Sequence, residues 1–173
     1  MTSSDTPDPA AVRQGDLRLL DCATAQHLLV STIPARLAYL ATDGTPRLIP
    51  TWFHWTGEEL VMPTFLAAPH IRRAPARLRA LRAHPDVAVT IDTETFPPAV
   101  LTMRGRVSLT EVDGVAAEYA ASANRYLGEQ GAAYIAHLDQ PGTRMMRVGL
   151  RPAWVGLIDF QTRLPDNMRV EAA

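Results

Sequence analysis

The sequence predicts a mainly β protein, an antiparallel and closed or partly closed barrel with helices at its ends. Apolar and polar residues alternate over several short stretches, as they do in strands with one buried face. Turn-forming pairs such as Asp43-Gly44 and Thr56-Gly57 separate these stretches, which favours hairpins and therefore antiparallel pairing. The chain holds about seven such stretches and about three or four helical ones, so the sheet is the main element.

The first half of the chain reads as one helix followed by three strands. The expected elements are a helix from Asp21 to before Pro34 and strands over 35–42, 46–55 and 59–65. Asp43-Gly44 favours the tight turn of a hairpin between the first two strands. Pro50 donates no backbone hydrogen bond, so the second strand has an edge or a bulge at that point.

The second half reads as helices interleaved with longer strands. The expected elements are a helix from Pro75 to about Ala83, strands over 86–93 and 99–112, helices over 114–128 and 129–138, and strands over 143–150 and 153–160. Arg151-Pro152 is taken as the break between the last two strands. Gly105 falls on the inward face of its strand and predicts a bend there.

Composition excludes several classes of function. The net charge is −1, which argues against a general nucleic-acid binder. All 17 basic residues are arginine, so neither a lysine Schiff base nor a P-loop lysine is present. The single Cys22 suits a reducing cytoplasm, and no stretch approaches the length of a membrane span. Residues 1–20 are expected to form a flexible leader without a signal pattern.

Sequence templates for catalysis and metal binding find no match. The chain has no GxSxG, HExxH or GxGxxG motif, and its histidines never fall four residues apart. His54 is expected to pack or hydrogen-bond, and Asp92 and Asp159 to cap strand ends rather than act as acid and base. No catalytic residue and no metal ligand is therefore assigned.

Five arginines lie between Arg72 and Arg82, and Pro75 divides them. Arg72 and Arg73 precede the expected helix, where free N–H groups and the helix dipole favour an anion. The remaining three belong to the helix and are expected to be solvated or paired with acids. The alternative, that all five are surface arginines, stays open at this point.

The order of elements carries a family resemblance. The run ARLAYLATDGTPRLIPTWFHWTGEELVMPTF, then a helix, then HPDVAVTIDT and VLTMRGRVSLTEV, resembles the pyridoxamine 5′-phosphate oxidase-like family of FMN-binding split barrels. The resemblance is greatest to the branch that includes deazaflavin-dependent reductases. It covers about 35–160 and includes the later RPAWV ending. It implies a split-barrel domain over 21–165, followed by a tail over 166–173.

The resemblance also implies a site and a function. The expected protein is a homodimer with its cofactor at the interface, acting as an oxidoreductase on a small organic molecule. FMN is the first choice of cofactor and an 8-hydroxy-5-deazaflavin coenzyme the second. The strand that matches RLIPTWF would line the flavin ring, and the segment from Met62 to Arg73 would hold the ribityl chain and phosphate. The implied contacts are Pro50, Thr51, Trp52, Met62, Thr64, His70, Arg72 and Arg73.

Two departures from the family pattern support a second hypothesis. His70 stands where many members have a lysine, and Ala67-Ala68-Pro69 stands where small polar residues are usual. The alternative is a non-catalytic split barrel that holds a flavin, a haem or another ligand without turnover.

Overall fold

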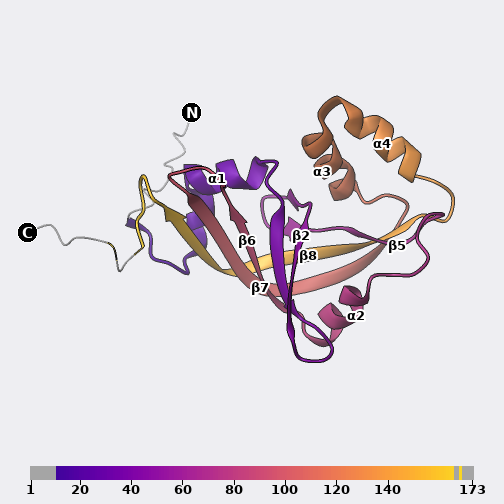
Figure 1. The fold of residues 1–173 in the computed structure, drawn as a ribbon, viewed down its shortest axis with the longest axis horizontal. Helices are drawn as coiled ribbons and strands as arrows, with labels where there is room; N and C mark the ends of the chain where they lie inside the picture. The colour runs from indigo at the N-terminus through magenta and orange to yellow at the C-terminus, as the bar shows by residue number, and fades with distance from the viewer. Residues whose placement is uncertain (1–10, 166–167, 169–173) are drawn as a thin grey trace, which may run out of the picture.

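The computed structural model describes residues 11–165 and residue 168, and over this range the chain is a mainly antiparallel β protein with peripheral helices, as the sequence predicts (Figure 1). The strands are β1 (Ala35–Leu40), β2 (Pro46–Thr51), β3 (His54–Trp55), β4 (Leu60–Val61), β5 (Thr64–Ala67), β6 (Asp86–Asp92), β7 (Ala99–Asp113) and β8 (Arg144–Asp159). The helices are η2 (Leu17–Asp21), α1 (Ala23–Val30), α2 (Ala76–Ala83), α3 (Ala117–Leu127), η3 (Gly128–Gln130) and α4 (Gly131–Leu138).

The strands form one sheet in the order β2-β1-β6-β7-β8-β4-β3, and β5 also pairs with β8. The two end strands, β2 and β3, are consecutive in the chain and are separated only by Trp52 and Phe53. The sheet therefore curls until its ends lie close together, and the chain itself joins them. The result is a partly closed barrel with a break at these two residues.

The barrel interior holds one hydrophobic core. Val87, Val89 and Ile91 of β6 are buried, as are Leu101 and Met103 of β7, which confirms the predicted alternation in both strands. Side chains from α1 and β8 join the same cluster. Because the core fills the interior, a site for a ligand must lie against the outside or the ends of the barrel.

The free edge of the sheet is β2, which agrees with the edge position expected from Pro50. The hairpin closes with a hydrogen bond of 2.9 Å from Ala41 N to Thr45 O. In this register, alternate residues of β2 turn their backbone groups toward β1, and Pro46, Leu48 and Pro50 are left on the free side. Two of these three have no N–H, so the edge offers few donors to a further strand.

The predicted break at Arg151-Pro152 is wrong, because β8 is one continuous strand paired with β7 over its whole length. The register steps from Arg104 opposite Trp154 to Gly105 opposite Pro152, which is a β-bulge. Gly105 is required here, because a Cβ atom would lie 2.5 Å from the carbonyl oxygen of Arg151. The expected bend at Gly105 is confirmed, and the bulge accommodates the proline.

Two other strands are shorter than their sequence patterns indicate. The strand expected over 46–55 is interrupted at Trp52 and Phe53, and the one expected over 59–65 is interrupted before Thr64. Pro63 has no N–H to donate, which explains the second interruption. Both interruptions occur where the chain passes the side of the barrel that carries the candidate site.

Residues 11–21 pack against the barrel, although the sequence places residues up to 20 in a flexible leader. The Gln14 side chain donates to Leu157 O at 2.7 Å and accepts from Leu157 N at 2.9 Å. Val12 and Leu19 are buried in the core. Residues 1–10 of that leader, and 166–167 and 169–173 of the expected tail, lie outside the described residues.

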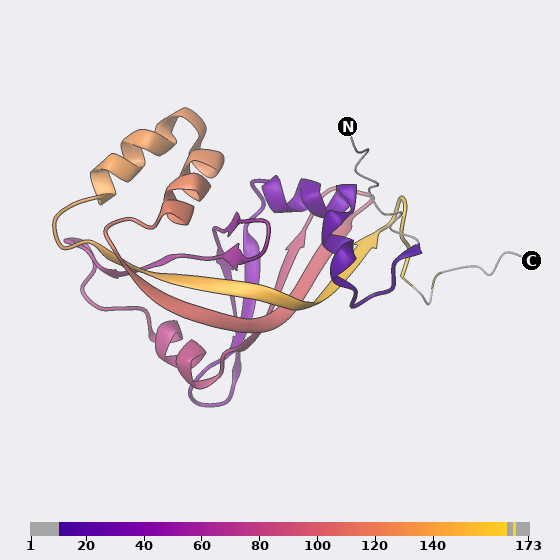
Figure 2. The same ribbon diagram turned by 180° about the vertical axis from the view of Figure 1, so that it is seen from behind.

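A helical pair, α3 and α4, is inserted between β7 and β8 (Figures 1 and 2). The two views show these helices beside the barrel and connected to it through the ends of the two long strands. Gly128 is the C-cap of α3 and has φ +58°, which agrees with the end of the helix expected over 114–128. In the described part of the chain, no helix has the length and apolarity needed to cross a bilayer.

Candidate functional site

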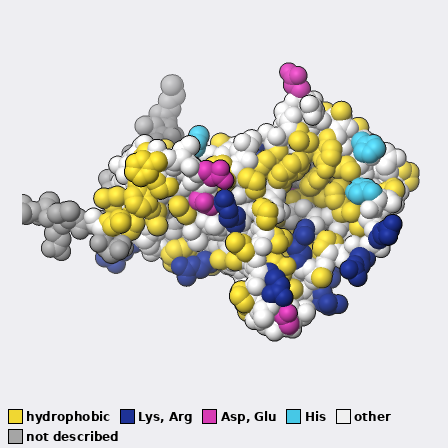
Figure 3. All heavy atoms as spheres, viewed as in Figure 1, with side chains coloured by type: hydrophobic (Ala, Val, Ile, Leu, Met, Phe, Trp, Pro, Cys, Tyr) yellow, Lys and Arg dark blue, Asp and Glu magenta, His cyan; other side chains and the backbone are white. Residues whose placement is uncertain are grey.

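The break between β2 and β3 opens onto a hollow of about 290 Å³. We call it the Trp52 hollow. It is lined by Thr51, Trp52, Pro63, Thr64, Phe65, Arg77, Tyr119 and Tyr134. Its walls come from the end of β2, from β5, from α2 and from the inserted helices, which are distant segments of the chain. Figure 3 shows hydrophobic side chains gathered on this part of the surface, with basic side chains bordering them.

Trp52 forms one wall because the strand break places it outside the barrel while its neighbour Phe53 enters the core. Its indole stacks on Tyr126 with ring centroids 4.8 Å apart and an interplanar angle of 5°. Tyr119 and Tyr134 also lie near the indole, at centroid distances of 6.2 and 6.3 Å. The Trp52 ring is therefore held in one orientation by aromatic contacts.

The opposite wall is also aromatic. Phe65 of β5 meets Tyr119 edge to face at 5.3 Å, and the hydroxyl groups of Tyr119 and Tyr134 lie 3.2 Å apart. Burial, with the hydrogen bond to Tyr134, raises the pKa of Tyr119 far above its usual value. Tyr119 therefore remains a neutral phenol at any physiological pH, able to donate or accept a hydrogen bond at the mouth of the hollow.

A half-buried cation lies at the other end of the hollow. Arg77 donates a hydrogen bond from its guanidinium to the hydroxyl oxygen of the buried Thr64. Burial lowers the pKa of Arg77, so its charge is poorly compensated by solvent. Among the described residues, no carboxylate lies within ion-pair distance of it. A ligand with an acidic group would supply the missing negative charge.

The structure brings together three of the residues that the sequence assigned to the site. Thr51, Trp52 and Thr64 line the hollow. Pro50 is exposed on the free edge of β2, and Met62 is buried in the hydrophobic core.

The remaining predicted residues lie on the exposed segment between β5 and α2. His70, Arg72 and Arg73 are exposed, and the His70 ring contacts Phe65 edge to face at 5.4 Å. None of the three lines the hollow. The segment therefore reaches the site only through His70, which contacts the lining residue Phe65, and not through its arginines.

The expectation that Arg77 is solvated or paired with an acid is wrong. Pro75 is the N-cap of α2, so Arg77 lies in the first turn of the helix. Side chains on a helix point back toward its N-terminus, which directs Arg77 toward β5. The helical pattern of α2 gave no signal for this, because Thr64 is 13 residues earlier in the chain.

Sequence reasoning also missed the tyrosines of the inserted helices. Tyr119 and Tyr126 are seven positions apart and share one face of α3, a signal that the sequence does contain. Tyr134 meets Tyr119 only because α3 and α4 pack together, and no local pattern indicates that contact.

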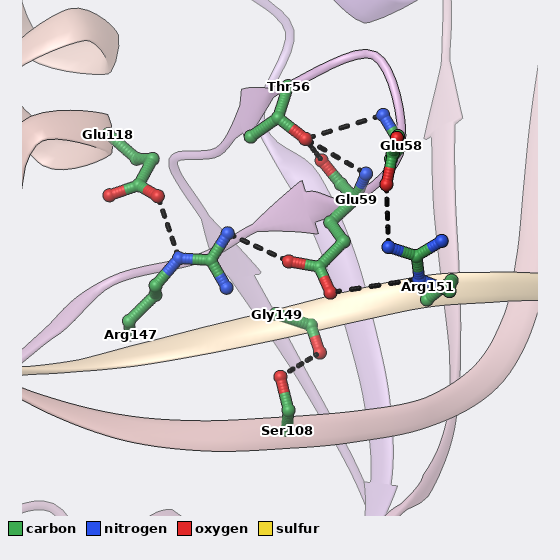
Figure 4. Close-up of polar contacts among 8 residues, drawn as sticks. All are labelled: Thr56, Glu58, Glu59, Ser108, Glu118, Arg147, Gly149 and Arg151. Atoms are coloured by element: carbon green, nitrogen blue, oxygen red, sulfur yellow. Dashed lines mark hydrogen bonds and ion pairs between the residues drawn. The ribbon is translucent and has the colours of Figure 1, made fainter.

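An ion-pair network fastens this region to the barrel (Figure 4). Arg147 of β8 lies between two acids, with its Nη2 atom 2.8 Å from Glu59 and its Nε atom 2.7 Å from Glu118 of α3. Burial alone would raise the pKa of Glu118, but the hydrogen bond and charge of Arg147 together with a backbone hydrogen bond outweigh it, and the pKa lies below its usual value. Both partners are about four-fifths shielded from solvent, so the pair is stronger than an ordinary surface pair.

Other ionisable side chains have structural partners. Asp92 pairs with Arg36, and Asp159 accepts hydrogen bonds from Thr24 and Thr162, so both aspartates cap or pair as expected. Burial lowers the pKa of His54 from its usual value, with Arg125 contributing. Across the described ranges, no three His, Cys, Asp or Glu side chains gather as a group that could hold a metal ion.

The arrangement is a flat aromatic slot with a cation at one end. Such a slot suits a planar ring that carries an acidic group, because the rings contact its faces and the guanidinium binds the anion. The lining residues include no carboxylate and no imidazole. The hollow is therefore built to bind and orient a ligand rather than to transfer protons through an acid–base pair.

The sequence matches no protein-family model and no curated protein, but the fold matches solved structures. An F420 reductase is 26% identical over 76% of this chain and 94% of its own, with a TM-score of 0.56. A conserved hypothetical protein of Mycobacterium tuberculosis is 17% identical over 84% of this chain and 89% of its own, with a TM-score of 0.60. A candidate pyridoxamine 5′-phosphate oxidase of Listeria innocua is 18% identical over 77% and 94%, with a TM-score of 0.51.

These likenesses agree with the strand order and the partly closed barrel described above. The chain therefore has the split-barrel fold of the pyridoxamine 5′-phosphate oxidase-like family, and the resemblance inferred from its sequence is confirmed.

Proposed function

We propose that the chain binds a flavin or deazaflavin cofactor in the Trp52 hollow and uses it to oxidise or reduce a small organic molecule. The observation that carries this proposal is the half-buried Arg77, without a carboxylate partner in the described part of the chain, at the end of an aromatic slot. The likeness to an F420 reductase supports a deazaflavin, and FMN fits the same combination of planar ring and phosphate.

In this proposal each wall has a separate task. Trp52 supports one face of the ring, and Thr51 contributes polar groups at its edge. Arg77 and Thr64 hold the phosphate, which neutralises the half-buried guanidinium. The cofactor supplies the redox chemistry when bound, while the chain orients it and excludes water.

The residues outside the hollow take secondary roles in the proposal. Arg72 and Arg73 are exposed on the segment between β5 and α2 and are assigned to the outer negative charges of a cofactor with a longer tail, with His70 beside them. Met62 supports the site from the core, and Pro50 borders it on the sheet edge.

The proposed assembly is a homodimer in the cytoplasm. The hollow is open on one side, and a second copy would close it and complete the site for the small-molecule substrate. The proposed domain is the split barrel over 21–165, with residues 11–20 packed on it.

The proposal is tested by titrating the purified protein with FMN, riboflavin and the deazaflavin coenzyme, with absorbance and fluorescence as readouts. Near-stoichiometric binding of one phosphate-bearing cofactor is expected, with weaker binding of riboflavin. A protein that binds none of the three would contradict the proposal. Size-exclusion chromatography tests the dimer, and a monomer that still binds cofactor at full affinity would contradict an interface site.

A non-catalytic ligand-binding protein is the second candidate. It is favoured by the lining residues, which include no acid or base other than phenols and Arg77. Stopped-flow reduction of the bound cofactor, followed by reoxidation with small organic acceptors, separates the two candidates. Turnover faster than that of the free cofactor supports the enzyme, and equal rates support the binding protein.

A further inference from the structure

The inserted segment 114–143 joins the barrel at a single place. It leaves β7 after Asp113 and returns to β8 at Arg144, and these two residues are paired across the sheet. Gly114 N donates to Thr143 O at 2.8 Å, directly beyond that pair. Thirty residues therefore depend on one narrow attachment at the end of the two longest strands.

Both ends of the segment carry a glycine in the left-handed region. Gly114 has φ +76° and Gly142 has φ +85°, conformations that other residues adopt only with strain. Glycines at the two ends of a two-helix segment allow the backbone rotations that a hinge requires. Figures 1 and 2 show α3 and α4 projecting from this attachment back along the side of the barrel.

The two helices form one unit. Gly131 lies so close to α3 that a Cβ atom would come within 2.6 Å of Asn124 Cα, so a larger residue would force the helices apart. The hydroxyl groups of Tyr119 and Tyr134 join the helices further along. A rotation about the glycine attachment would therefore carry both tyrosines together.

Polar and aromatic side-chain contacts hold this unit against the barrel. Tyr126 donates to Ile33 O at 3.2 Å and stacks on Trp52. Arg125 donates to Phe53 O, but its Nε atom is buried without a hydrogen-bond partner. Glu118 forms an ion pair with Arg147, and Tyr119 meets Phe65 of β5 edge to face at 5.3 Å. The contact between the helical pair and the barrel therefore leaves one buried polar atom without a hydrogen bond.

The segment also buries little apolar surface. Apart from Leu138 of α4, its buried residues are small, and the largest fully buried side chains of the described chain all lie outside the segment. Opening the segment would break a few polar contacts and the ring contacts of Trp52 and Phe65 with the tyrosines, and it would leave the barrel core intact. A region of this kind opens at a much smaller free energy than the whole domain unfolds.

We propose that the segment 114–143 is a hinged cover for the Trp52 hollow, and that Tyr119 and Tyr134 are its specificity-determining residues. In the closed position both tyrosines line the hollow and limit the thickness of the ring that fits beside Trp52. In the open position both tyrosines move away from the hollow together, and the ring of the ligand can enter it. The identity of the ligand rests on the proposed function, but the opening itself does not.

Hydrogen–deuterium exchange on the full ligand-free chain tests the hinge. The amides of α3 and α4 are expected to exchange at least about tenfold faster than those in the centres of β7 and β8. Glu118→Gln, which removes the charge that Arg147 binds, should accelerate exchange in the cover by about tenfold and leave the barrel unchanged. Asp86→Asn, which removes an exposed ion pair with Arg106 in the barrel and away from the attachment, is the control. Exchange of cover and barrel at one common rate would overturn the proposal.

FMN is the probe for the link between cover and hollow. Saturating FMN should slow exchange in α3 and α4, and Tyr134→Ala should relax the preference for FMN over ligands with a thicker ring system. FMN that binds without protecting these helices would overturn the assignment of the cover to this hollow. A cover that opens in a protein that binds no cofactor would contradict the proposed function and support the hinge.

Discussion

Arg77→Gln is the substitution that bears most directly on the anion end of the hollow. Gln keeps a polar group that can reach Thr64 but removes the charge. A charge-assisted hydrogen bond contributes about 1.5–3 kcal/mol net, so losing it should weaken FMN binding by about 10- to 150-fold. Riboflavin has the same ring without the phosphate, so its affinity should change by less than about threefold.

The assay is fluorescence titration of both ligands against wild type and three variants. Arg79→Gln is the matched control, because Arg79 is exposed on the same helix two residues further on. Arg72→Gln tests the residue that the sequence assigned to the phosphate. A variant Arg77→Gln that binds FMN as tightly as wild type, or that weakens FMN and riboflavin equally, would refute the assignment of Arg77. A larger loss with Arg72→Gln would return the phosphate to the exposed segment.

Three further substitutions test the fold and the aromatic wall. Gly105→Ala should destabilise the protein by about 1–3 kcal/mol, because the new Cβ meets a backbone oxygen at 2.5 Å; thermal unfolding measures this, and a change no larger than that of Ser108→Ala would contradict it. Burial raises the pKa of Asp159, but hydrogen bonds from Gln161 N, Thr24 and Thr162 together outweigh it and hold the pKa below its usual 3.8. The carboxylate therefore stabilises the fold above about pH 3.8, and this stabilisation is lost as the pH falls through the lower pKa of the folded state. Asp159→Asn should therefore lower unfolding free energy by about 1–3 kcal/mol at pH 7 and by less at pH 3; urea unfolding that shows an equal gap at both pH values would count against this. Trp52→Leu should weaken FMN and riboflavin alike by about 2- to 10-fold, whereas a loss confined to FMN would show that Trp52 does not contact the ring.

Local patterns in the sequence were sufficient to predict most of the sheet. β6 and β7 alternate without interruption, and both lie where the pattern places them. The Asp43-Gly44 hairpin and the Gly128 helix end depend on residues adjacent in sequence, and both are confirmed. The number of short antiparallel strands already indicated a closed or partly closed barrel, and the family resemblance added that it is a split barrel.

The errors arise where distant segments determine the outcome. Pro152 interrupts the local pattern of β8, but pairing with β7 continues on both sides because Gly105 leaves room for the bulge. Arg77 was assigned to solvent or to an acidic partner from its helix alone, although Thr64 of β5 lies next to it. In both cases the missing information is a tertiary contact that leaves no trace in the neighbouring residues.

The candidate site shows the same limit. Thr51, Trp52 and Thr64 were found through the resemblance, which places a ligand near the strand break. The tyrosines that line the hollow belong to α3 and α4, and their position depends on how the segment 114–143 packs against the barrel. Sequence reasoning could identify the tyrosines on one face of α3 but not the surface that they meet.

A crystal structure of the protein grown with FMN or the deazaflavin coenzyme is the most direct test of the central claim. The ring is expected against Trp52, with a phosphate oxygen within hydrogen-bond distance of Arg77 and Thr64, and with Tyr119 and Tyr134 closed over it. A cofactor bound elsewhere on the barrel, or a phosphate held by Arg72 and Arg73 with Arg77 unengaged, would contradict it.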